Sequence, residues 1–436
     1  MKNPGTPRTG APAPGVSAPG APSSGASTHS PSPSGASPSA EQASLSAFQA
    51  ESAEASANRA PSPPGGGRQK IALLPGDGIG VEVTAEAVKV LEAARDRFSL
   101  DLELVPLPYS AEHYLATGES LPEGALEDFR NRYSAIFIGA FGDPRVPDMR
   151  HARDILLGIR FGLDLFVNLR PVQLLDPRLC PLKEKEAVDV DFVVFRENTE
   201  GAYVGMGGNF KRGTADEVAI QEEVHTRKGV ERIVRAAFEY AREHGRPRIT
   251  LCDKSNVMRF GHDLWQRVFA EVSEAYPEIS TDHYYVDALA MELIRSPERF
   301  EVIVTNNMFG DILTDVGAAL QGGLGVAASA NLGASGIGMF EPVHGSAPPL
   351  AGTGQANPAA AVLTAALMLE HLGHREAAAE VQAAVADSLR AGRSTPDVGG
   401  VWTTSQVGDH LAERVRCGGV SSPPRPEPAQ LTTSLS

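Results

Sequence analysis

Short apolar runs alternate with helix-like segments along most of the 436-residue chain, and this alternation limits the possible folds most strongly. Apolar runs that fit buried strands lie at 70–75, 102–105, 135–139, 191–195, 248–252 and 302–305. Apolar residues at helical spacing lie at 81–98, 123–131, 156–165, 227–244, 359–373 and 377–390. Strands that alternate with helices predict an α/β fold with largely parallel sheets.

Both ends of the chain differ in composition from this body. Residues 1–67 are almost all Ala, Ser, Pro and Gly, with no Leu before Leu45, and residues 417–436 also read as a loose tail. Such segments bury too little apolar area to offset the entropy of ordering, so we predict two disordered tails. The N-terminal tail lacks the apolar core of a secretory signal and has too much Pro and Gly for an amphipathic import helix. A cytoplasmic location is therefore favoured over organelle import. The chain also has no run of about 18 apolar residues, which excludes a membrane span.

Charge and cysteine content narrow the function classes. The chain has 39 Lys and Arg against 54 Asp and Glu, a net charge of −15, which argues against a nucleic-acid-binding protein. Its three cysteines, Cys180, Cys252 and Cys417, lie far apart and form no C-x-x-C pair. A disulfide framework and a zinc site are therefore both disfavoured.

The glycine turn at 76–80, after the first strand, invites a dinucleotide-binding interpretation. That fingerprint requires G-x-G-x-x-G, and here Val81 occupies the position of the third glycine. Glycines that permit a tight strand-to-helix turn are the favoured explanation. We therefore predict an α/β fold that is not a G-x-G-x-x-G Rossmann fold.

Two acidic residues follow the apolar run at 302–305. Asp311 and Asp315 are four positions apart, so both carboxylates project from one face of the predicted helix. Two oxygen donors on one face suit Mg²⁺ or Mn²⁺. An acidic residue near a helix N-terminus is also an ordinary cap, which explains Asp311 but does not require Asp315. A metal site and a cap both remain open at this point.

Three arginines form a second set of candidates. Arg160 and Arg170 flank an apolar segment, and Arg196 directly follows the strand-like run at 192–195. A guanidinium at the end of a buried strand needs a carboxylate or phosphate partner. Each arginine alone fits a structural ion pair, whereas three beside a divalent metal indicate a di- or tricarboxylate substrate.

Lys254 and Tyr203 are candidates for proton transfer. Lys254 follows the apolar run at 248–252, where a lowered pKa would let it act as a base. A solvated surface lysine is the alternative. Tyr203 is a candidate proton donor, or an aromatic side chain that fills the edge of a core.

Several of these segments belong to motifs that occur in order along residues 70–416. They are Leu74-Pro-Gly-Asp-Gly-Ile-Gly80, Asn168-Leu-Arg-Pro-Val172, Arg196-Glu-Asn-Thr-Glu-Gly-Ala-Tyr203, Asp253-Lys-Ser-Asn-Val257, Tyr285-Val-Asp287, Gly310-Asp-Ile-Leu-Thr-Asp315, Glu341-Pro-Val-His-Gly-Ser-Ala-Pro348 and Ala356-Asn-Pro358. Together they resemble the β-decarboxylating dehydrogenases, which act on isopropylmalate, isocitrate, homoisocitrate, tartrate or malate. The resemblance is strongest to the isopropylmalate enzymes.

This resemblance implies two α/β domains around a shared cleft, in a homodimer whose subunits share active sites. Residues 68–165 plus 322–416 would form the first, cofactor-binding domain, and 166–321 the second domain for dimerisation, metal and substrate. The implied partners are a small 2-hydroxy acid and a second copy of the chain, without nucleic acid or membrane.

The same resemblance implies the site residues. The substrate carboxylates would be held by Arg160, Arg170 and Arg196, and Mg²⁺ or Mn²⁺ by Asp311 and Asp315 with Asp287 from a second subunit, where Asp287 also meets the substrate. Lys254, also from that subunit, would accept the hydroxyl proton, and Tyr203 would protonate the enol. The cofactor would lie against Glu341, His344, Gly345, Ser346, Asn357 and Asp397.

Two departures from the family pattern bear on specificity. At the positions where family members contact the adenosine ribose of the cofactor, this chain has Pro349-Leu350. This pair has neither the acidic side chain that would hydrogen-bond the ribose of NAD nor a basic side chain that would bind the 2′-phosphate of NADP. We expect NAD because nothing basic is visible there, and NADP stays open. Arg153 replaces a glutamate that is usual in isopropylmalate enzymes.

The substrate side chain would meet the helix before Arg160. Leu156 and Leu157 suit an isopropyl group, and burying a carboxylate against them would cost several kcal/mol, which disfavours isocitrate. We therefore expect oxidative decarboxylation of 3-isopropylmalate in leucine biosynthesis. Tartrate and D-malate enzymes also carry leucines here and have a similar loop at 142–148, so they are the alternative. A non-catalytic regulatory subunit is disfavoured because the catalytic residue types are all present.

Overall fold

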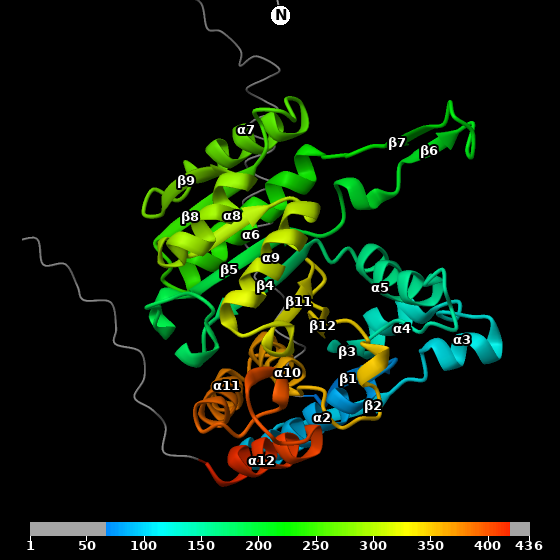
Figure 1. Ribbon diagram of the computed structural model, residues 1–436, viewed down its shortest axis with the longest axis vertical. Coiled ribbons are helices and arrows are strands. Elements are labelled where there is room, and N and C mark those ends of the chain that lie inside the picture. The colour runs from blue at the N-terminus through cyan, green and yellow to red at the C-terminus, as the bar shows by residue number, and fades with distance from the viewer. Residues whose placement is uncertain (1–66, 419–436) are drawn as a thin grey trace, which may run out of the picture. The chain divides into compact units, whose positions relative to one another are not determined.

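A ten-stranded sheet runs through residues 67–418, the part of the chain that the computed structural model describes (Figure 1). In sheet order the strands are β2 (Leu102–Pro106), β1 (Gln69–Gly76), β3 (Ala135–Ala140), β12 (Gly338–Pro342), β11 (Ala328–Leu332), β4 (Val167–Gln173), β5 (Asp191–Glu197), β10 (Val302–Thr305), β8 (Arg248–Asp253) and β9 (Ser280–Tyr285). Six of the pairings are parallel, and the three antiparallel ones join β12, β11, β4 and β5 in the middle. The predicted α/β fold with a largely parallel sheet is confirmed.

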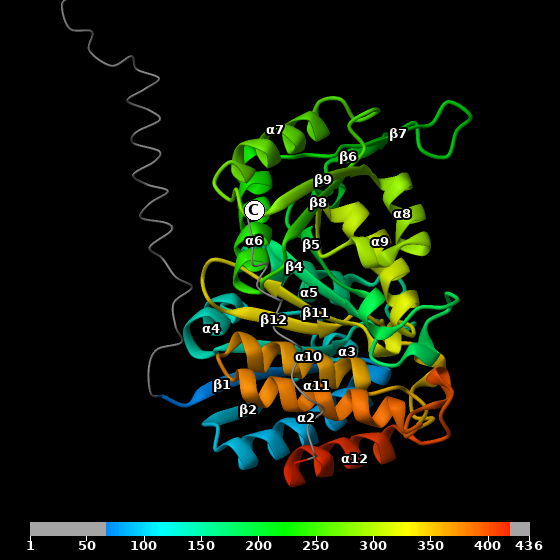
Figure 2. The ribbon, with the colours of Figure 1, turned by 90° about the vertical axis from the view of Figure 1, so that its left-hand side faces the viewer.

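Helices cover both faces of this sheet. They are α2 (Ile79–Phe98), α3 (Ala111–Thr117), α4 (Ala125–Arg132), α5 (Arg150–Gly162), α6 (Arg227–Glu243), α7 (Gly261–Ser273), α8 (Val286–Arg295), α9 (Asn307–Gln321), α10 (Ala359–His371), α11 (Arg375–Arg390) and α12 (Thr404–Cys417). Figure 2 shows β5 and β8 between α6 and α7 on one side and α8 and α9 on the other. Among the described residues, no helix is long and apolar enough to cross a membrane.

Successive residues of the central strands enter different cores, which explains their unbroken apolar runs. In β1, Ile71 and Leu73 pack with α2 and α10, whereas Ala72 and Leu74 pack with α4 and α5. In β5, Val193 faces the α6–α7 side and its neighbours face α8 and α9. Strands buried on both faces lose the alternation of polar and apolar residues.

The glycine turn after β1 brings three segments close together. Gly76 has φ 75°, and a Cβ there would lie 1.9 Å from the Ala140 carbonyl oxygen, so only glycine fits. Asp77 is buried and accepts hydrogen bonds from the backbone N–H groups of Ala111 and Gly142, at 2.7 and 2.8 Å. Glycine at this turn therefore allows close packing against Ala140, in agreement with the explanation that the sequence favoured.

A two-stranded arm projects from the rest of the fold. Its strands are β6 (Gly207–Phe210) and β7 (Val218–Gln221), which pair only with each other and whose eight residues are all exposed (Figure 1). Four exposed apolar side chains lie on or beside it: Met206, Phe210, Val218 and Ile220.

The predicted tails, 1–67 and 417–436, lie outside the described residues except for Gly67, Cys417 and Gly418. Cys417 is the last residue of α12.

Candidate active site

Helix α9 presents the two predicted metal ligands at the carboxyl end of β10. Its N-cap is Asn306, whose side-chain oxygen accepts a hydrogen bond from the Phe309 N–H at 2.8 Å. Asp311 is therefore not the cap, and its carboxylate is available for other contacts. Asp315 lies one turn further on and is exposed, while Asp311 is half-buried.

Two buried arginines meet at the Asp311 carboxylate. Arg196 donates to Asp311 Oδ1 at 2.5 Å, and Arg170 approaches the same oxygen at 3.4 Å. The Arg196 guanidinium also donates twice to Asn307 Oδ1, at 3.0 and 2.7 Å. A Cβ on Gly310 would lie 2.5 Å from Arg196 Cγ, so glycine at this position lets the arginine pass beneath α9. The structure thus brings Arg170, Arg196 and Asp311 together.

The charge balance of this cluster favours an anion. Burial, and then the neighbouring Arg170, lower the pKa of Arg196 to about 10, so it remains charged at neutral pH. Burial raises the pKa of Asp311, but Arg196 and the Tyr203 hydroxyl outweigh that effect and lower it overall. One carboxylate thus faces two buried guanidiniums, and an anionic group would neutralise the excess positive charge.

Tyr203 lies on the other oxygen of Asp311. It belongs to the short helix η3 (Ala202–Val204), and its hydroxyl donates to Asp311 Oδ2 at 2.7 Å. Burial, and then the Asp311 carboxylate, raise the pKa of Tyr203 above its usual value. The phenol therefore keeps its proton at neutral pH, as a proton donor requires.

Arg160 is paired with a residue of the predicted cofactor set. It donates to Glu341 Oε1 at 2.6 Å, and Asn331 donates to the same oxygen at 2.9 Å. Burial raises the pKa of Glu341, but Arg160 outweighs it and keeps the carboxyl ionised. Arg160 Nε has no hydrogen-bond partner within the described residues and is buried, so this guanidinium retains an unused donor.

Asparagines connect the two arginine groups, and sequence reasoning did not single them out. Arg170 Nε donates to Asn168 Oδ1 at 2.7 Å, and Asn168 donates to Asn331 Oδ1 at 2.9 Å. Asn331 continues the chain to Glu341. Asn168 lies in a recognised motif, which was an available signal, whereas Asn331 on β11 had none.

Leu156 and Leu157 lie on α5, one turn before Arg160, and both are half-buried. Leu156 packs against the core formed with β1 and β3. Asp154 lies 3.4 Å from the Ser120 hydroxyl, and Arg153 is exposed.

Lys254 and Asp287 form a separate group. Lys254 Nζ donates to Asp287 Oδ1 at 2.6 Å, and the side chain of Asp287 is 70% exposed. Within the described residues, the hydrogen bonds and ion pairs of this Lys–Asp pair do not include Arg170, Arg196 or Asp311. One chain therefore presents two partial sites.

The remaining predicted cofactor residues lie on three segments of the chain. Ser346 is buried and its carbonyl accepts from the Ile79 N–H at 2.9 Å, which ties this loop to the glycine turn after β1. His344 Nε2 is buried without a partner among the described residues, and burial lowers the pKa of this imidazole. Gly345 is exposed. Asn357, just before α10, donates to Oδ2 of Asp397, on the short helix η7 (Pro396–Val398), at 3.0 Å.

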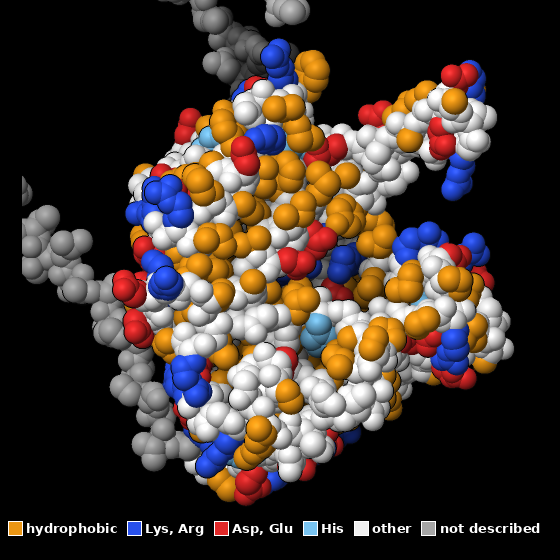
Figure 3. All heavy atoms as spheres, in the orientation of Figure 1, with side chains coloured by type: hydrophobic (Ala, Val, Ile, Leu, Met, Phe, Trp, Pro, Cys, Tyr) orange, Lys and Arg blue, Asp and Glu red, His pale blue; other side chains and the backbone are white. Residues whose placement is uncertain are grey.

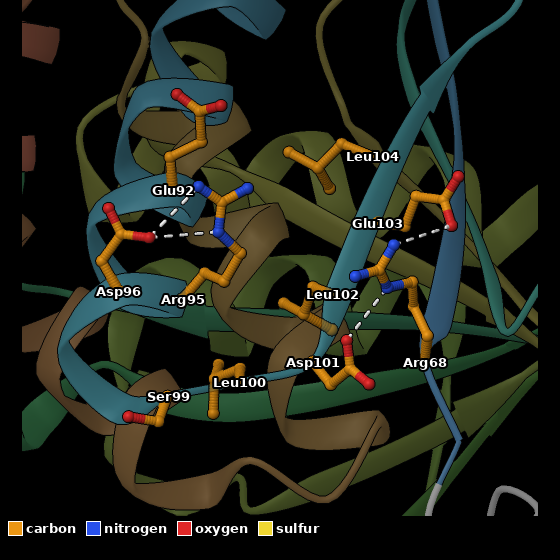
Figure 4. A pocket seen from close by; sticks show the side chains of 10 residues that line it. All are labelled: Arg68, Glu92, Arg95, Asp96, Ser99, Leu100, Asp101, Leu102, Glu103 and Leu104. Atoms are coloured by element: carbon orange, nitrogen blue, oxygen red, sulfur yellow. Dashed lines mark hydrogen bonds and ion pairs between the residues drawn. The ribbon is translucent and has the colours of Figure 1, made fainter.

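Figure 3 shows a hollow between the β6–β7 arm and α5, with basic and acidic side chains inside it. A recess of about 690 Å³ lies elsewhere, along the edge strand β2 (Figure 4). Its charges pair with each other: Arg68 with Asp101 and Arg95 with Asp96, both at 3.1 Å. This recess contains none of the predicted site residues.

Comparison with known proteins shows which family this chain resembles. Residues 70–411 match the sequence profile of the family described as isocitrate/isopropylmalate dehydrogenase. A 3-isopropylmalate dehydrogenase of Thermobifida fusca is 48% identical over 348 residues, which cover 79% of this chain and 97% of that protein. The Streptomyces coelicolor protein of the same name is 47% identical, over 79% and 98%. The crystal structure of isocitrate dehydrogenase from Methylococcus capsulatus is similar with a TM-score of 0.72 and 37% identity, over 80% of this chain and 99% of that one.

Proposed function

Because this chain belongs to the isocitrate/isopropylmalate dehydrogenase family, we propose that it converts (2R,3S)-3-isopropylmalate to 4-methyl-2-oxopentanoate and CO₂. The reaction would transfer a hydride to NAD⁺ and serve leucine biosynthesis. The observation that carries the choice of substrate is the half-buried pair Leu156 and Leu157, one turn from Arg160. An isopropyl group gains apolar contact there, whereas a third carboxylate would lose hydration without a charged partner.

Substrate binding would rest on the arginines. Arg170 and Arg196 supply more positive charge than Asp311 neutralises, and Arg160 keeps a buried Nε donor that has no partner in the described part of the chain. Bidentate guanidinium contacts hold a carboxylate in a fixed plane, which orients the C–H bond that is broken.

The donor set fits a hard divalent cation. Asp311 and Asp315 offer carboxylate oxygens one turn apart, and Asp287, which is largely exposed, would complete the set from a second copy of the chain. Bound Mg²⁺ or Mn²⁺ would polarise the substrate oxygen and stabilise the negative charge that develops during decarboxylation. We expect chelation to abolish turnover, and Mg²⁺ or Mn²⁺ to restore it.

Two side chains would move protons. Lys254, from the second copy, would accept the proton of the substrate hydroxyl at Nζ. At the same time, the hydride would leave the carbon that bears this hydroxyl. Tyr203 would then donate its phenolic proton to the enol carbon, a role that its raised pKa favours.

The cofactor residues would hold a dinucleotide against Glu341. His344 Nε2, which has no partner among the described residues, and the side chains of Asn357 and Asp397 would offer it donors and acceptors. NAD⁺ would supply the hydride acceptor. Pro349 is exposed on the short helix η6 (Pro348–Leu350), so that helix offers no cation for a 2′-phosphate, which favours NAD over NADP.

Exposed apolar surface supports a homodimer with shared sites. Met291 and Ile294 on α8 and Ile312 on α9 are about half exposed, beside both partial sites, and the arm adds four more apolar side chains. A second copy that covers this surface would bring Lys254 of one chain towards Asp311 of the other. We further propose that 68–165 plus 322–416 and 166–321 act as two domains around the cleft.

Steady-state assays with NAD⁺ and Mn²⁺ test this proposal. Equal yields of NADH and CO₂ from 3-isopropylmalate, at a kcat/KM well above that for tartrate, D-malate or isocitrate, are the expected result. A higher kcat/KM for D-malate or tartrate would favour the second candidate, which the loop at 142–148 and Arg153 support. No turnover on any of these acids would refute both.

A further inference from the structure

Glu223 lies at the base of the arm, two residues after β7, next to three side chains that the proposed mechanism does not use. These three neighbours are His225, His262 on α7 and Asn306, the N-cap of α9. We call these four residues the Glu223 cluster. The side chains of Glu223, His225 and His262 are 13%, 3% and 1% exposed, so the cluster is largely shielded from water.

The cluster contacts the helix that carries the acidic pair. Asn306 Nδ2 donates to Glu223 Oε1 at 3.0 Å, while its Oδ1 caps α9 through the Phe309 N–H. The amide orientation of Asn306 is therefore set at both ends. Glu223 in this way fixes the first turn of α9, one turn before Asp311.

The cluster also contacts the segment of the proposed base. His262 Nδ1 accepts a hydrogen bond from the Lys254 backbone N–H at 2.7 Å. His262 in turn lies with Nε2 3.7 Å from Glu223 Oε2. A single imidazole therefore connects Glu223 to the backbone from which the Lys254 side chain extends.

A third contact leads to the proposed proton donor. Val224, between Glu223 and His225, pairs with Gly201 through backbone hydrogen bonds of 2.8 and 3.3 Å. Gly201 is the N-cap of η3, the short helix that carries Tyr203. The segments of Tyr203, Lys254 and Asp311 therefore each contact residues 223–225 or a side chain of the Glu223 cluster.

Glu223, His225 and His262 lie close enough together to hold a metal ion, but their hydrogen bonds oppose that alternative. The N–H of Lys254 occupies Nδ1 of His262, and the indole N–H of Trp265 occupies Nδ1 of His225 at 3.2 Å. Each neutral imidazole must then carry its proton on Nε2, the atom that faces Glu223, where a metal would need a lone pair.

Glu223 suits this arrangement as an acceptor. Its Oε1 lies 3.1 Å from His225 Nε2, within ion-pair distance, although this nitrogen forms no hydrogen bond with any described residue. His262 Nε2 and Asn306 Nδ2 lie only 3.2 Å apart, and both carry protons, so a carboxylate beside them relieves their repulsion. Burial raises the pKa of Glu223, but His225 and His262 outweigh it and lower the value to about 2.

We propose that Glu223, acting through His262 and Asn306, is a positioning residue that aligns the Lys254 segment with the acidic face of α9. The expected effect of Glu223 on turnover rests on the proposed function, whereas its expected effect on the order of the Lys254 segment and α9 does not. Glutamine at position 223 has nearly the same side-chain volume, but its N–H₂ group would face one of the donors on His225, His262 and Asn306. The alignment of the Lys254 segment with α9 would therefore loosen.

Glu223→Gln in the full-length protein tests the positioning role in two ways. We expect kcat to fall about tenfold to a hundredfold with KM changed less than about threefold, because misplaced catalytic groups slow chemistry more than binding. Independently of turnover, hydrogen exchange is expected to rise in peptides that contain the Lys254 and Phe309 amides. Glu413→Gln, an exposed isosteric change on α12, is the matched control and should alter neither quantity.

His262 provides a second pair of variants. His262→Phe keeps the aromatic contact with Phe309 but removes the acceptor for the Lys254 N–H, and it should reproduce both effects. His262→Gln supplies an acceptor oxygen and should recover part of them. Unchanged exchange at Lys254 and Phe309 in Glu223→Gln and His262→Phe would overturn the proposal, even if the substrate differs from ours. A Zn²⁺ site that equilibrium dialysis detects in the wild type and in Glu413→Gln, but not in Glu223→Gln, would overturn it too.

Discussion

Replacing Arg196 with lysine removes the hydrogen-bonding pattern of the site while keeping its charge. The Arg196 side chain is 2% exposed and donates to two acceptors, Asn307 and Asp311. A lysine ammonium at the end of a flexible chain can reach one of these acceptors, but not both in the same plane.

The size of the effect follows from the contact that is lost. A hydrogen bond to a charged group contributes about 1.5–3 kcal/mol, and burial at this site leaves no solvent to replace it. We therefore expect Arg196→Lys to lower the free energy of unfolding by about 1.5–3 kcal/mol. Loss of the fork towards a substrate carboxylate would add about a tenfold to hundredfold fall in kcat/KM.

Urea denaturation and initial-rate kinetics measure the two effects. The control is Arg267→Lys on α7, where the side chain is 54% exposed and pairs with Asp263, and a change within about 0.5 kcal/mol is expected. Equal urea midpoints and equal kcat/KM for Arg196→Lys and wild type would refute the reasoning that Arg196 organises this cluster.

Three further predictions address specificity, assembly and pH. Leu156→Asn should lower kcat/KM for 3-isopropylmalate about 10- to 200-fold but leave that for D-malate, which has no isopropyl group, within about threefold; equal losses on both would count against the leucine contact. Ile294→Asp should shift the protein to monomers in sedimentation velocity and abolish turnover, whereas Val188→Asp, at another exposed apolar residue, should not; an active monomer would contradict shared sites. The pKa of Glu223 is lowered to about 2 in the folded chain, against about 4.3 unfolded. Its contribution to stability is thus present above about pH 4.3 and lost as the pH falls towards 2, so wild type and Glu223→Gln should converge in urea midpoint over that range and differ by a constant amount above pH 5.

Strands and helices whose apolar residues follow the spacing of a buried element were predictable from the sequence. Elements that form only through hydrogen bonds to a neighbouring strand were not. The apolar runs at 135–139 and 302–305 became β3 and β10 because their side chains fill cores on both faces. Strand β9 has a polar sequence and is mostly exposed, so only its pairing with β8 reveals it. Helix α5 begins at Arg150, six residues before the predicted start, and His151 in its first turn is buried against Asp77 at 2.8 Å.

The residue types of the site were predictable from motifs, but their connections were not. Spacing placed Asp311 and Asp315 on one helical face, yet nothing in it indicated that Arg196, 115 residues away, would share an oxygen with Arg170. The chain of asparagines likewise depends on β4 and β11 lying side by side, and the pairing of Arg160 with Glu341 joins α5 to β12. Distances of this kind are set by tertiary packing rather than by local sequence.

Complementation between two inactive variants tests most directly whether Lys254 of one chain and Asp311 of another build one catalytic centre. Lys254→Ala and Asp311→Asn should each be inactive alone. Random pairing of the two makes about half of the dimers mixed, each with one intact site, so the mixture should regain about a quarter of the wild-type activity. Mixed dimers isolated through two different tags and still inactive on 3-isopropylmalate would contradict the account.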